Sequence, residues 1–202
     1  MKEKKKESVI MIRDTIIDSR SYRSFKENIK IHEDDLREIL DAVRLCPSAQ
    51  NLQPLKYKLV TSAYEIEDVL AVTKWAGALP DAKLPPEGHH PTAFIAVCCD
   101  TKIVDDPTEA YFDAGIAAQS IMLLACEKGF GGCILRAFDP DELSKNLRIP
   151  KKCEPVCLIA LGVPDETVII CEIPKSGETK YFRDKANLHF VPKRSLESII
   201  IE

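Results

Sequence analysis

The sequence predicts an α+β fold, an α/β sandwich built around one long buried helix. Three observations predict it. Short apolar runs typical of strands alternate with segments of helical period, and residues 108–128 are apolar on nearly every side. The 202 residues, 45% hydrophobic and 30% charged, are enough to bury one core. No internal repeat is present, so we assign residues 1–202 to a single domain, with about 1–8 as a flexible terminus.

Helices are predicted where apolar residues recur at the helical period. These segments are residues 8–17, 36–43, 66–70, 108–128 and 140–147. Acids at 33–35 favour the start of the second helix, and Pro47 limits its end. Ser62 and Glu65 form a capping box that opens the third helix.

Residues with strong capping preferences flank the long helix and the helix that follows it. Gly129 is placed to end the long helix in the left-handed conformation that glycine favours. Asp139, Pro140 and Glu142 supply an N-cap, a proline at the first helical position and a capping-box acid for the next helix. Because the long helix is apolar on nearly all sides, we expect it either at the centre of a core or in a dimer interface.

Strands are predicted where short apolar or alternating runs lie between these helices. They cover residues 56–61, 94–99, 132–135 and 156–161, with a terminal run at 195–201. Residues 76–92 contain six glycines or prolines and are expected to form a loop. A proline-rich stretch of this length inside a compact domain is more often a functional lid than a linker.

Composition argues against several functional classes. A net charge of −4 without a basic stripe disfavours a nucleic-acid partner. No stretch approaches 18 uncharged apolar residues, and Arg13 and Asp14 break the apolar run near the N-terminus, so we expect a cytoplasmic protein without a membrane span or signal peptide. The eight cysteines include no Cys-x-x-Cys pair, so we expect reduced thiols that pack as small hydrophobes, and no metal site.

Three polar segments remain as candidates for chemistry, since no glycine-rich nucleotide loop and no Gly-x-Ser-x-Gly elbow is present. Arg20 and Arg23 would share one face, as a phosphate clamp requires, if the first helix continued through them. Residues 47–54 hold hydroxyl and amide groups between two prolines, which suits the edge of a flat heterocycle. Residues 193–194 are a third basic pair. Each segment alone also fits ordinary surface charge or a polar turn.

Taken in order along the chain, five segments resemble the nitroreductase family. They are Ser19-Arg20-Ser21-Tyr22-Arg23, Pro47-Ser48-Ala49-Gln50-Asn51-Leu52-Gln53-Pro54, Asp113 with Gly115 and Gln119, Gly129-Phe130-Gly131-Gly132, and Lys193-Arg194-Ser195-Leu196-Glu197. The resemblance runs from about residue 9 to the C-terminus. It departs from the family pattern at Ser19, where an arginine is usual, and at Leu55, where a tryptophan often follows.

The resemblance implies a nitroreductase-like fold, with a central mixed or antiparallel sheet flanked by helices. It also implies a homodimer that holds FMN at its interface. The residues that it assigns to FMN are Arg20, Ser21, Lys193 and Arg194 at the phosphate and ribityl chain, Arg23 at the pyrimidine edge, Pro47, Ser48, Ala49, Asn51 and Gln53 in the segment contributed by the partner subunit, and the backbone near Leu135, Arg136 and Ala137 at flavin N5.

On this interpretation the flavin carries the chemistry and no side chain acts as nucleophile or general base. Hydride would pass from NADH or NADPH through flavin N5 to a small electron-poor acceptor, such as a nitroaromatic, quinone or enone, in a ping-pong cycle. Two alternatives stay open. One is a reductive dehalogenase or a flavin-consuming branch of the same family, and the other is a flavin-binding protein with little turnover.

Overall fold

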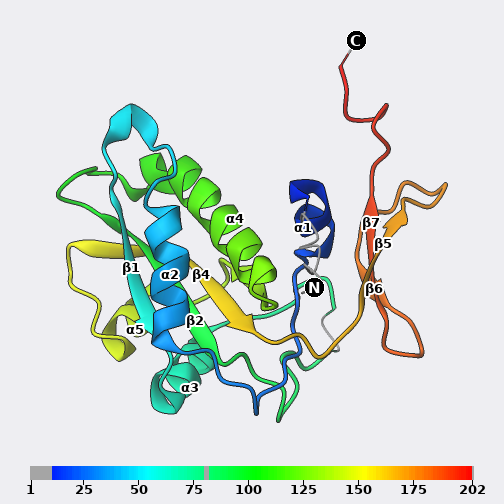
Figure 1. Ribbon diagram of the computed structural model, residues 1–202, viewed down its shortest axis with the longest axis horizontal. Helices are drawn as coiled ribbons and strands as arrows, with labels where there is room; N and C mark the ends of the chain where they lie inside the picture. Colours follow the sequence, from blue (N-terminus) through cyan, green and yellow to red (C-terminus); the bar gives the residue numbers. More distant parts are fainter. Residues whose placement is uncertain (1–10, 80–81, 202) are drawn as a thin grey trace, which may run out of the picture.

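The computed structural model of the protein describes residues 11–79 and 82–201. The main sheet has the strand order β1-β2-β4-β3, and neighbouring strands are antiparallel. Its strands are β1 (Leu55–Val60), β2 (Ala93–Asp100), β3 (Gly131–Leu135) and β4 (Cys153–Gly162). Figure 1 shows the sheet with helices packed against it. The predicted α+β sandwich is therefore confirmed, and its central sheet is antiparallel.

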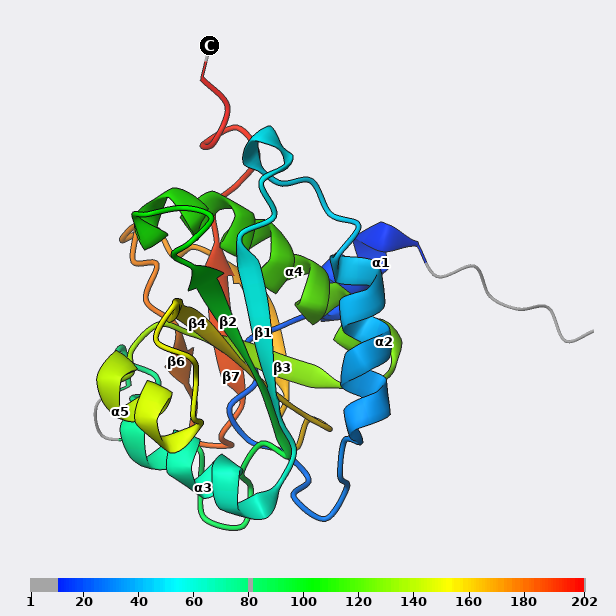
Figure 2. The ribbon, with the colours of Figure 1, turned by 90° about the vertical axis from the view of Figure 1, so that its left-hand side faces the viewer.

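Helices cover both faces of the main sheet. On one face lie α2 (Glu33–Val43) and α4 (Tyr111–Glu127), and on the other lie α3 (Ala63–Val72) and α5 (Pro140–Asn146). Figure 2 shows the two helix layers from the side of β1. Because both faces are covered, every residue of β2 is buried.

The predicted capping residues explain where several helices begin and end. Ser62 Oγ accepts the N–H of Glu65 at 3.3 Å and opens α3. Gly129 follows α4 with a φ of 80°, in the left-handed region that glycine favours. Asp139 accepts two backbone N–H groups of α5 at 3.1 and 3.0 Å. The predicted role of Glu142 in a capping box is wrong, because the Asp139 N–H that it would accept donates instead to the Val72 carbonyl at 3.1 Å. The Glu142 carboxylate pairs with Lys145.

The long helix α4 is preceded by a 3-10 turn, η2 (Pro107–Ala110). Seven of its residues are buried, which confirms the predicted buried helix on the face that meets the sheet. The opposite face is exposed within the single chain, where Phe112 is 77% exposed and Gly115 and Gln119 are exposed beside it. A dimer interface over this outer face stays a prediction.

Two elements lie outside the main sandwich. The first helix, α1 (Ile12–Asp18), confirms the predicted helix over 8–17 within the described residues; 8–10 lie outside them. A second sheet has the order β5-β7-β6, from β5 (Val168–Glu172), β7 (His189–Lys193) and β6 (Phe182–Arg183). In Figure 1 this sheet lies beyond α1, on the side away from α4.

The strand predicted over residues 195–201 is wrong. The last strand is β7, and the residues after it form turns with exposed apolar side chains, including Leu196, Ile199 and Ile201. An apolar run becomes a strand only where another strand pairs with it, and among the described residues no strand pairs with this run. The apolar pattern of residues 195–201 does not say whether another strand pairs with them.

The sequence predicted none of the three strands of the second sheet, but the loop over 76–92 and the cysteines agree with the prediction. The described residues of the 76–92 loop contain no helix, as predicted. Cys98, Cys99, Cys133, Cys153 and Cys157 are buried free thiols, which confirms that most of the cysteines pack as hydrophobes. Of the helices that the structure describes, none combines the length and apolar composition that a bilayer crossing needs.

Candidate functional site

The segment after α1 is extended and lies along an edge of the main sheet. Tyr22 donates its backbone N–H to the Gly132 carbonyl at 2.8 Å, and Ser21 forms a parallel bridge with Gly132. Farther along, Phe25 pairs antiparallel with Pro164. Backbone pairing with β3 and with the connection after β4 therefore fixes residues 20–26.

This conformation overturns the predicted helical clamp. The helix ends at Asp18, and the backbone of Ser19 is extended, with φ −73° and ψ 96°. In extended backbone successive side chains point to opposite sides, so residues three apart do not share a face. Arg20 and Arg23 are therefore held by different surroundings.

Glycines make the close approach of this segment possible. A Cβ atom on Gly131 would overlap the Tyr22 ring and lie 2.5 Å from Pro164 Cγ. A Cβ atom on Gly162 would lie 2.7 Å from Phe25 Cδ1. Real Cβ atoms do not approach that closely, so glycine at these positions lets the segment dock on the sheet.

The two arginines each keep a hydrogen-bond donor free. The Arg20 guanidinium donates to the Ile16 carbonyl, and Arg23 Nη1 donates to the Ser21 carbonyl at 3.2 Å. The Nε atoms of both arginines are buried and have no hydrogen-bond partner within the described residues. An unpaired buried N–H is costly, so both positions suit an anionic or carbonyl-bearing ligand such as FMN.

The polar segment after α2 is a rigid turn anchored to α4. Ser48 Oγ donates to Asp113 Oδ2 at 2.5 Å, and the Ala49 N–H donates to Asp113 Oδ1 at 3.1 Å. The Gln53 N–H then donates to Ser48 Oγ at 2.9 Å. Asn51 and Gln53 have φ values of 57° and 53°, and their side chains are exposed. Asp113, which the resemblance named without a role, is therefore the anchor of this turn.

Within one chain the arginine segment and this turn lie apart. Ser19 Oγ donates to the Met122 carbonyl on α4 at 3.3 Å, whereas the turn is fixed to Asp113, nine residues earlier on the same helix. At about 1.5 Å per residue, the two attachment points are about 13 Å apart along the helix. The single chain therefore does not bring the two predicted groups together.

The other predicted site residues occupy two further places. Leu135 ends β3 and is buried, the Arg136 guanidinium lies 4.8 Å from the centre of the Tyr111 ring, and the Ala137 carbonyl accepts the Lys74 N–H at 2.7 Å. The basic pair at 193–194 is exposed at the end of β7, beside a hollow of about 590 Å³ that it shares with β5.

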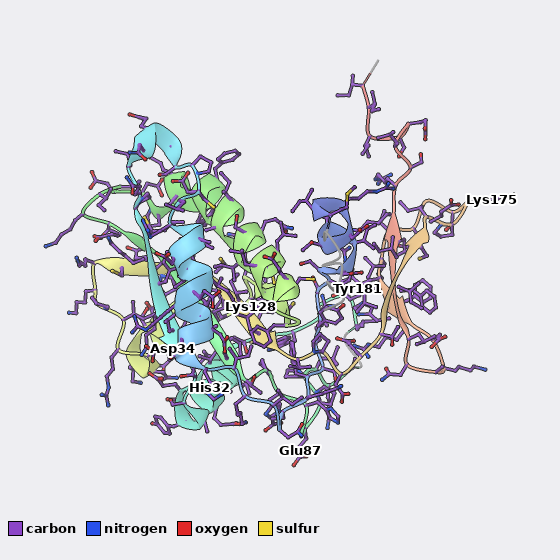
Figure 3. The ribbon with its side chains drawn as sticks, in the orientation of Figure 1. His32, Asp34, Glu87, Lys128, Lys175 and Tyr181 are labelled. Carbon is purple, nitrogen blue, oxygen red and sulfur yellow. The ribbon has the colours of Figure 1, made fainter. Side chains whose placement is uncertain are left out.

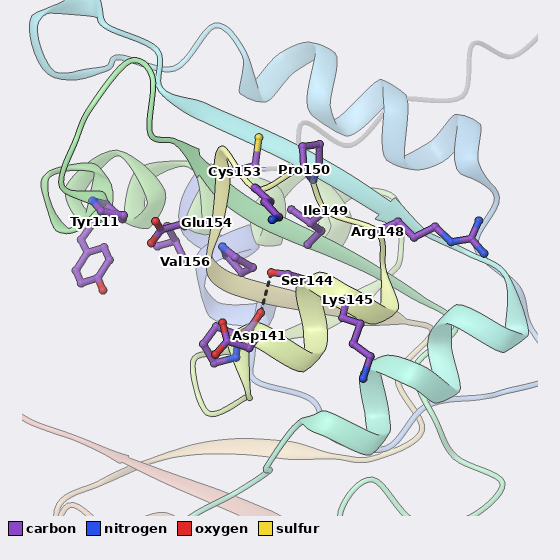
Figure 4. A pocket seen from close by; sticks show the side chains of 14 residues that line it. Tyr111, Asp141, Ser144, Lys145, Arg148, Ile149, Pro150, Cys153, Glu154 and Val156 are labelled. Atoms are coloured by element: carbon purple, nitrogen blue, oxygen red, sulfur yellow. Dashed lines mark hydrogen bonds between the residues drawn. The ribbon is translucent and has the colours of Figure 1, made fainter.

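A larger hollow adjoins Tyr111, with a volume of about 940 Å³. Figure 4 shows it between the first turn of α4, helix α5 and the start of β4, lined by Ser144 and Glu154 among others. It contains none of the residues predicted to bind FMN. Arg136 does not line this hollow, but its guanidinium contacts Tyr111, which does.

The loop over 76–92 contacts the arginine segment directly at His89 and indirectly through Tyr181. The Ala78 N–H donates to Tyr181 Oη at 3.3 Å, and the Tyr181 ring lies under the Arg23 guanidinium at 4.8 Å. Figure 3 shows Tyr181 beside the second sheet, on the side of α1. The Phe25 N–H donates to the His89 carbonyl at 3.0 Å. The loop thus ends against the segment that carries both arginines.

The sequence did not single out a buried polar cluster that packs against the same segment. It consists of Glu166, Tyr181, Arg183 and His189. A glutamate in a polar stretch and a histidine in an apolar strand carry no pattern that predicts their contact. The signal that could have found them is the pairing of residues 23–26 with 163–166, which appears only in three dimensions.

Comparisons with known proteins identify the family and the fold of the chain. The model of the Nitroreductase family matches residues 16–163. A protein of Archaeoglobus fulgidus with the provisional name NADH dehydrogenase/NAD(P)H nitroreductase is 28% identical over 152 residues, which cover 73% of this chain and 82% of that protein.

Two solved structures show the same fold. A nitroreductase family protein of Clostridium difficile 630 superposes with a TM-score of 0.64 at 20% identity, over 96% of this chain and 98% of that chain. A protein of Exiguobacterium sibiricum 255-15, provisionally named a nitroreductase and solved in complex with FMN, superposes with a TM-score of 0.64 at 18% identity, over 79% and 91%.

Proposed function

Because the chain belongs to the nitroreductase family, we propose that it is an FMN-dependent oxidoreductase that moves hydride from NADH or NADPH to a small electron-poor acceptor. FMN, when bound, supplies this chemistry at its N5 atom. The observation that carries the proposal is a pair of buried Nε atoms, of Arg20 and Arg23 on one fixed segment, that have no hydrogen-bond partner among residues 11–79 and 82–201. The FMN complex of a protein with the same fold supports it.

The chain's own residues would bind and orient the cofactor. Arg20 and Ser21, with the basic pair Lys193 and Arg194, would hold the phosphate and ribityl chain through charge-assisted hydrogen bonds. Arg23 would place positive charge at the pyrimidine edge, where negative charge develops on reduction. No proton-transferring side chain is required of the protein.

We propose that the site is completed in a homodimer, with Pro47, Ser48, Ala49, Asn51 and Gln53 of one subunit facing the arginine segment of the other. The distance of about 13 Å along α4 between the two attachment points supports this arrangement. Exposed apolar surface supports it as well. Helix α1 has no buried residue, and Phe112 on the outer face of α4 is 77% exposed.

The acceptor is proposed by class, as a nitroaromatic, a quinone or an enone. Free thiols at all eight cysteines fit a reducing cytoplasm, which we keep as the proposed location. Anaerobic steady-state kinetics against a panel of these acceptors and halophenols test the proposal. Parallel double-reciprocal lines for one class support ping-pong transfer. Halide release identifies a dehalogenase, and loss of the flavin itself identifies a flavin-consuming enzyme.

A further inference from the structure

Glu166 lies in the connection between β4 and β5 with a buried side chain, 3% exposed. Its carboxylate accepts the backbone N–H of Arg23 and a guanidinium N–H of Arg183. His189 Nδ1 lies 3.7 Å from the same carboxylate. Burial raises the pKa of Glu166, but His189, the Arg23 N–H and Arg183 together outweigh burial and hold that pKa below its usual range. A charged carboxylate therefore joins three segments.

Arg23 is held through both its backbone and its side chain. Glu166 accepts the backbone N–H, and the guanidinium lies 4.8 Å from the centre of the Tyr181 ring. Tyr181 in turn packs edge-on against the buried His189 ring, with 5.3 Å between ring centres. The cluster thus contacts Arg23 at its backbone through Glu166 and at its guanidinium through Tyr181.

Both basic parts of the proposed cofactor site start from this cluster. Arg23 continues toward the N-terminus into Ser21 and Arg20, in the extended segment that lies along β3. His189 begins β7, which ends at Lys193, about 13 Å farther at roughly 3.3 Å per residue. Glu166 contacts the start of the arginine segment at Arg23 and the start of β7 at His189. It therefore helps to set the distance between the arginine segment and β7.

We propose that Glu166 is a positioning residue of the cofactor site. It holds Arg23, and through it Ser21 and Arg20, in the conformation that binds FMN, and does so without contacting FMN. The inference rests on the proposed function. A buried carboxylate is stable only with its partners. Its removal leaves the Arg23 N–H without this acceptor and takes from the Arg183 guanidinium one of its two acceptors, the other being Asn187 Oδ1. Arg23 can then shift within the segment, while the backbone bonds of Tyr22 and Lys26 still hold the segment on the sheet.

The test compares E166A and E166Q with a matched control, D100N. Asp100 is also a buried carboxylate, 6% exposed, that accepts a backbone N–H and lies 3.2 Å from a lysine Nζ. It differs in position, because it ends β2, where it pairs with Cys153 and not with the arginine segment. The measurements are FMN affinity of the apoprotein by flavin fluorescence, urea unfolding, and hydrogen exchange of the amides in residues 23–26.

E166A is expected to weaken FMN binding at least tenfold and to remove exchange protection at Arg23. E166Q, which keeps an acceptor but loses the charge, is expected to weaken binding at least threefold. D100N should lose stability and keep wild-type affinity. Wild-type affinity in E166Q overturns the inference, even if E166A does not fold. Equal weakening by D100N overturns it too. A wild-type protein that binds no FMN instead refutes the proposed function.

Discussion

Ser48 and Asp113 form a short hydrogen bond, 2.5 Å from Oγ to Oδ2, that fixes the turn after α2 to the first turn of α4. The same carboxylate accepts the Ala49 N–H at 3.1 Å. These bonds hold the turn over residues 47–54 against α4. A turn with three residues at positive φ needs such an anchor, because each of these conformations is costly for a residue with a side chain.

Asp113→Ala should therefore free the turn. We expect a loss of about 1.5–3 kcal/mol in the free energy of unfolding, the range for hydrogen bonds to a charged group, and incomplete FMN loading. Asp106→Ala is the control for loss of a helix-capping carboxylate, since exposed Asp106 caps η2 through the Thr108 N–H at 2.9 Å and does not touch the turn. Urea unfolding and the flavin-to-protein absorbance ratio measure both effects. Full FMN loading of Asp113→Ala would show that the turn does not contribute to FMN binding.

Local signals in the sequence predicted most of the helices and strands. A cap such as Asp139 or a stop such as Gly129 acts on its own neighbours, and periodicity is likewise local. The sequence did not predict that residues 20–26 would pair with Gly132 and with the chain after β4, because pairing between distant segments depends on the whole fold. The same reason explains the wrong strand at 195–201 and the failure to find Glu166.

Arg20→Ala should lower FMN affinity by roughly 1.5–3 kcal/mol, because it removes a charged hydrogen bond to the phosphate. Arg37→Ala is the control, since Arg37 pairs with Glu33 on the exposed surface of α2. Fluorescence titration of the apoproteins with FMN gives both constants. Equal affinities in the two variants would show that Arg20 does not bind the cofactor.

Phe112→Lys should give a monomer that retains little FMN. Phe112 is 77% exposed on the outer face of α4, and a charge buried there would be unpaired in an interface. Tyr64→Lys is matched in exposure, at 76%, but lies on α3. Sedimentation measures the mass of each variant. A dimer of Phe112→Lys at micromolar concentration would place the interface elsewhere.

Tyr57 should make the protein less stable in alkali. Burial raises the pKa of its phenol to about 12, with Cys46 and Cys157 adding to the shift. The raised pKa means that the folded protein keeps this proton when the unfolded chain has lost it. The associated stability is complete below about pH 10 and is lost as pH rises toward 12.

The comparison of Tyr57→Phe with wild type isolates this group. By pH 11 the wild type should have lost about 1.4 kcal/mol more than Tyr57→Phe, relative to pH 9. Tyr64→Phe serves as the exposed control and should behave like the wild type. Urea unfolding at the two pH values measures the difference. Identical alkaline losses in Tyr57→Phe and wild type would contradict the buried environment of Tyr57.

Anaerobic titration of the purified protein with NADH and with NADPH tests the central claim most directly. The account predicts a yellow protein whose flavin absorbance bleaches with one equivalent of at least one nicotinamide and returns when an electron-poor acceptor is added. A yellow protein that neither nicotinamide bleaches would leave only a flavin-binding role. A colourless protein that cannot be loaded with FMN would contradict the account itself.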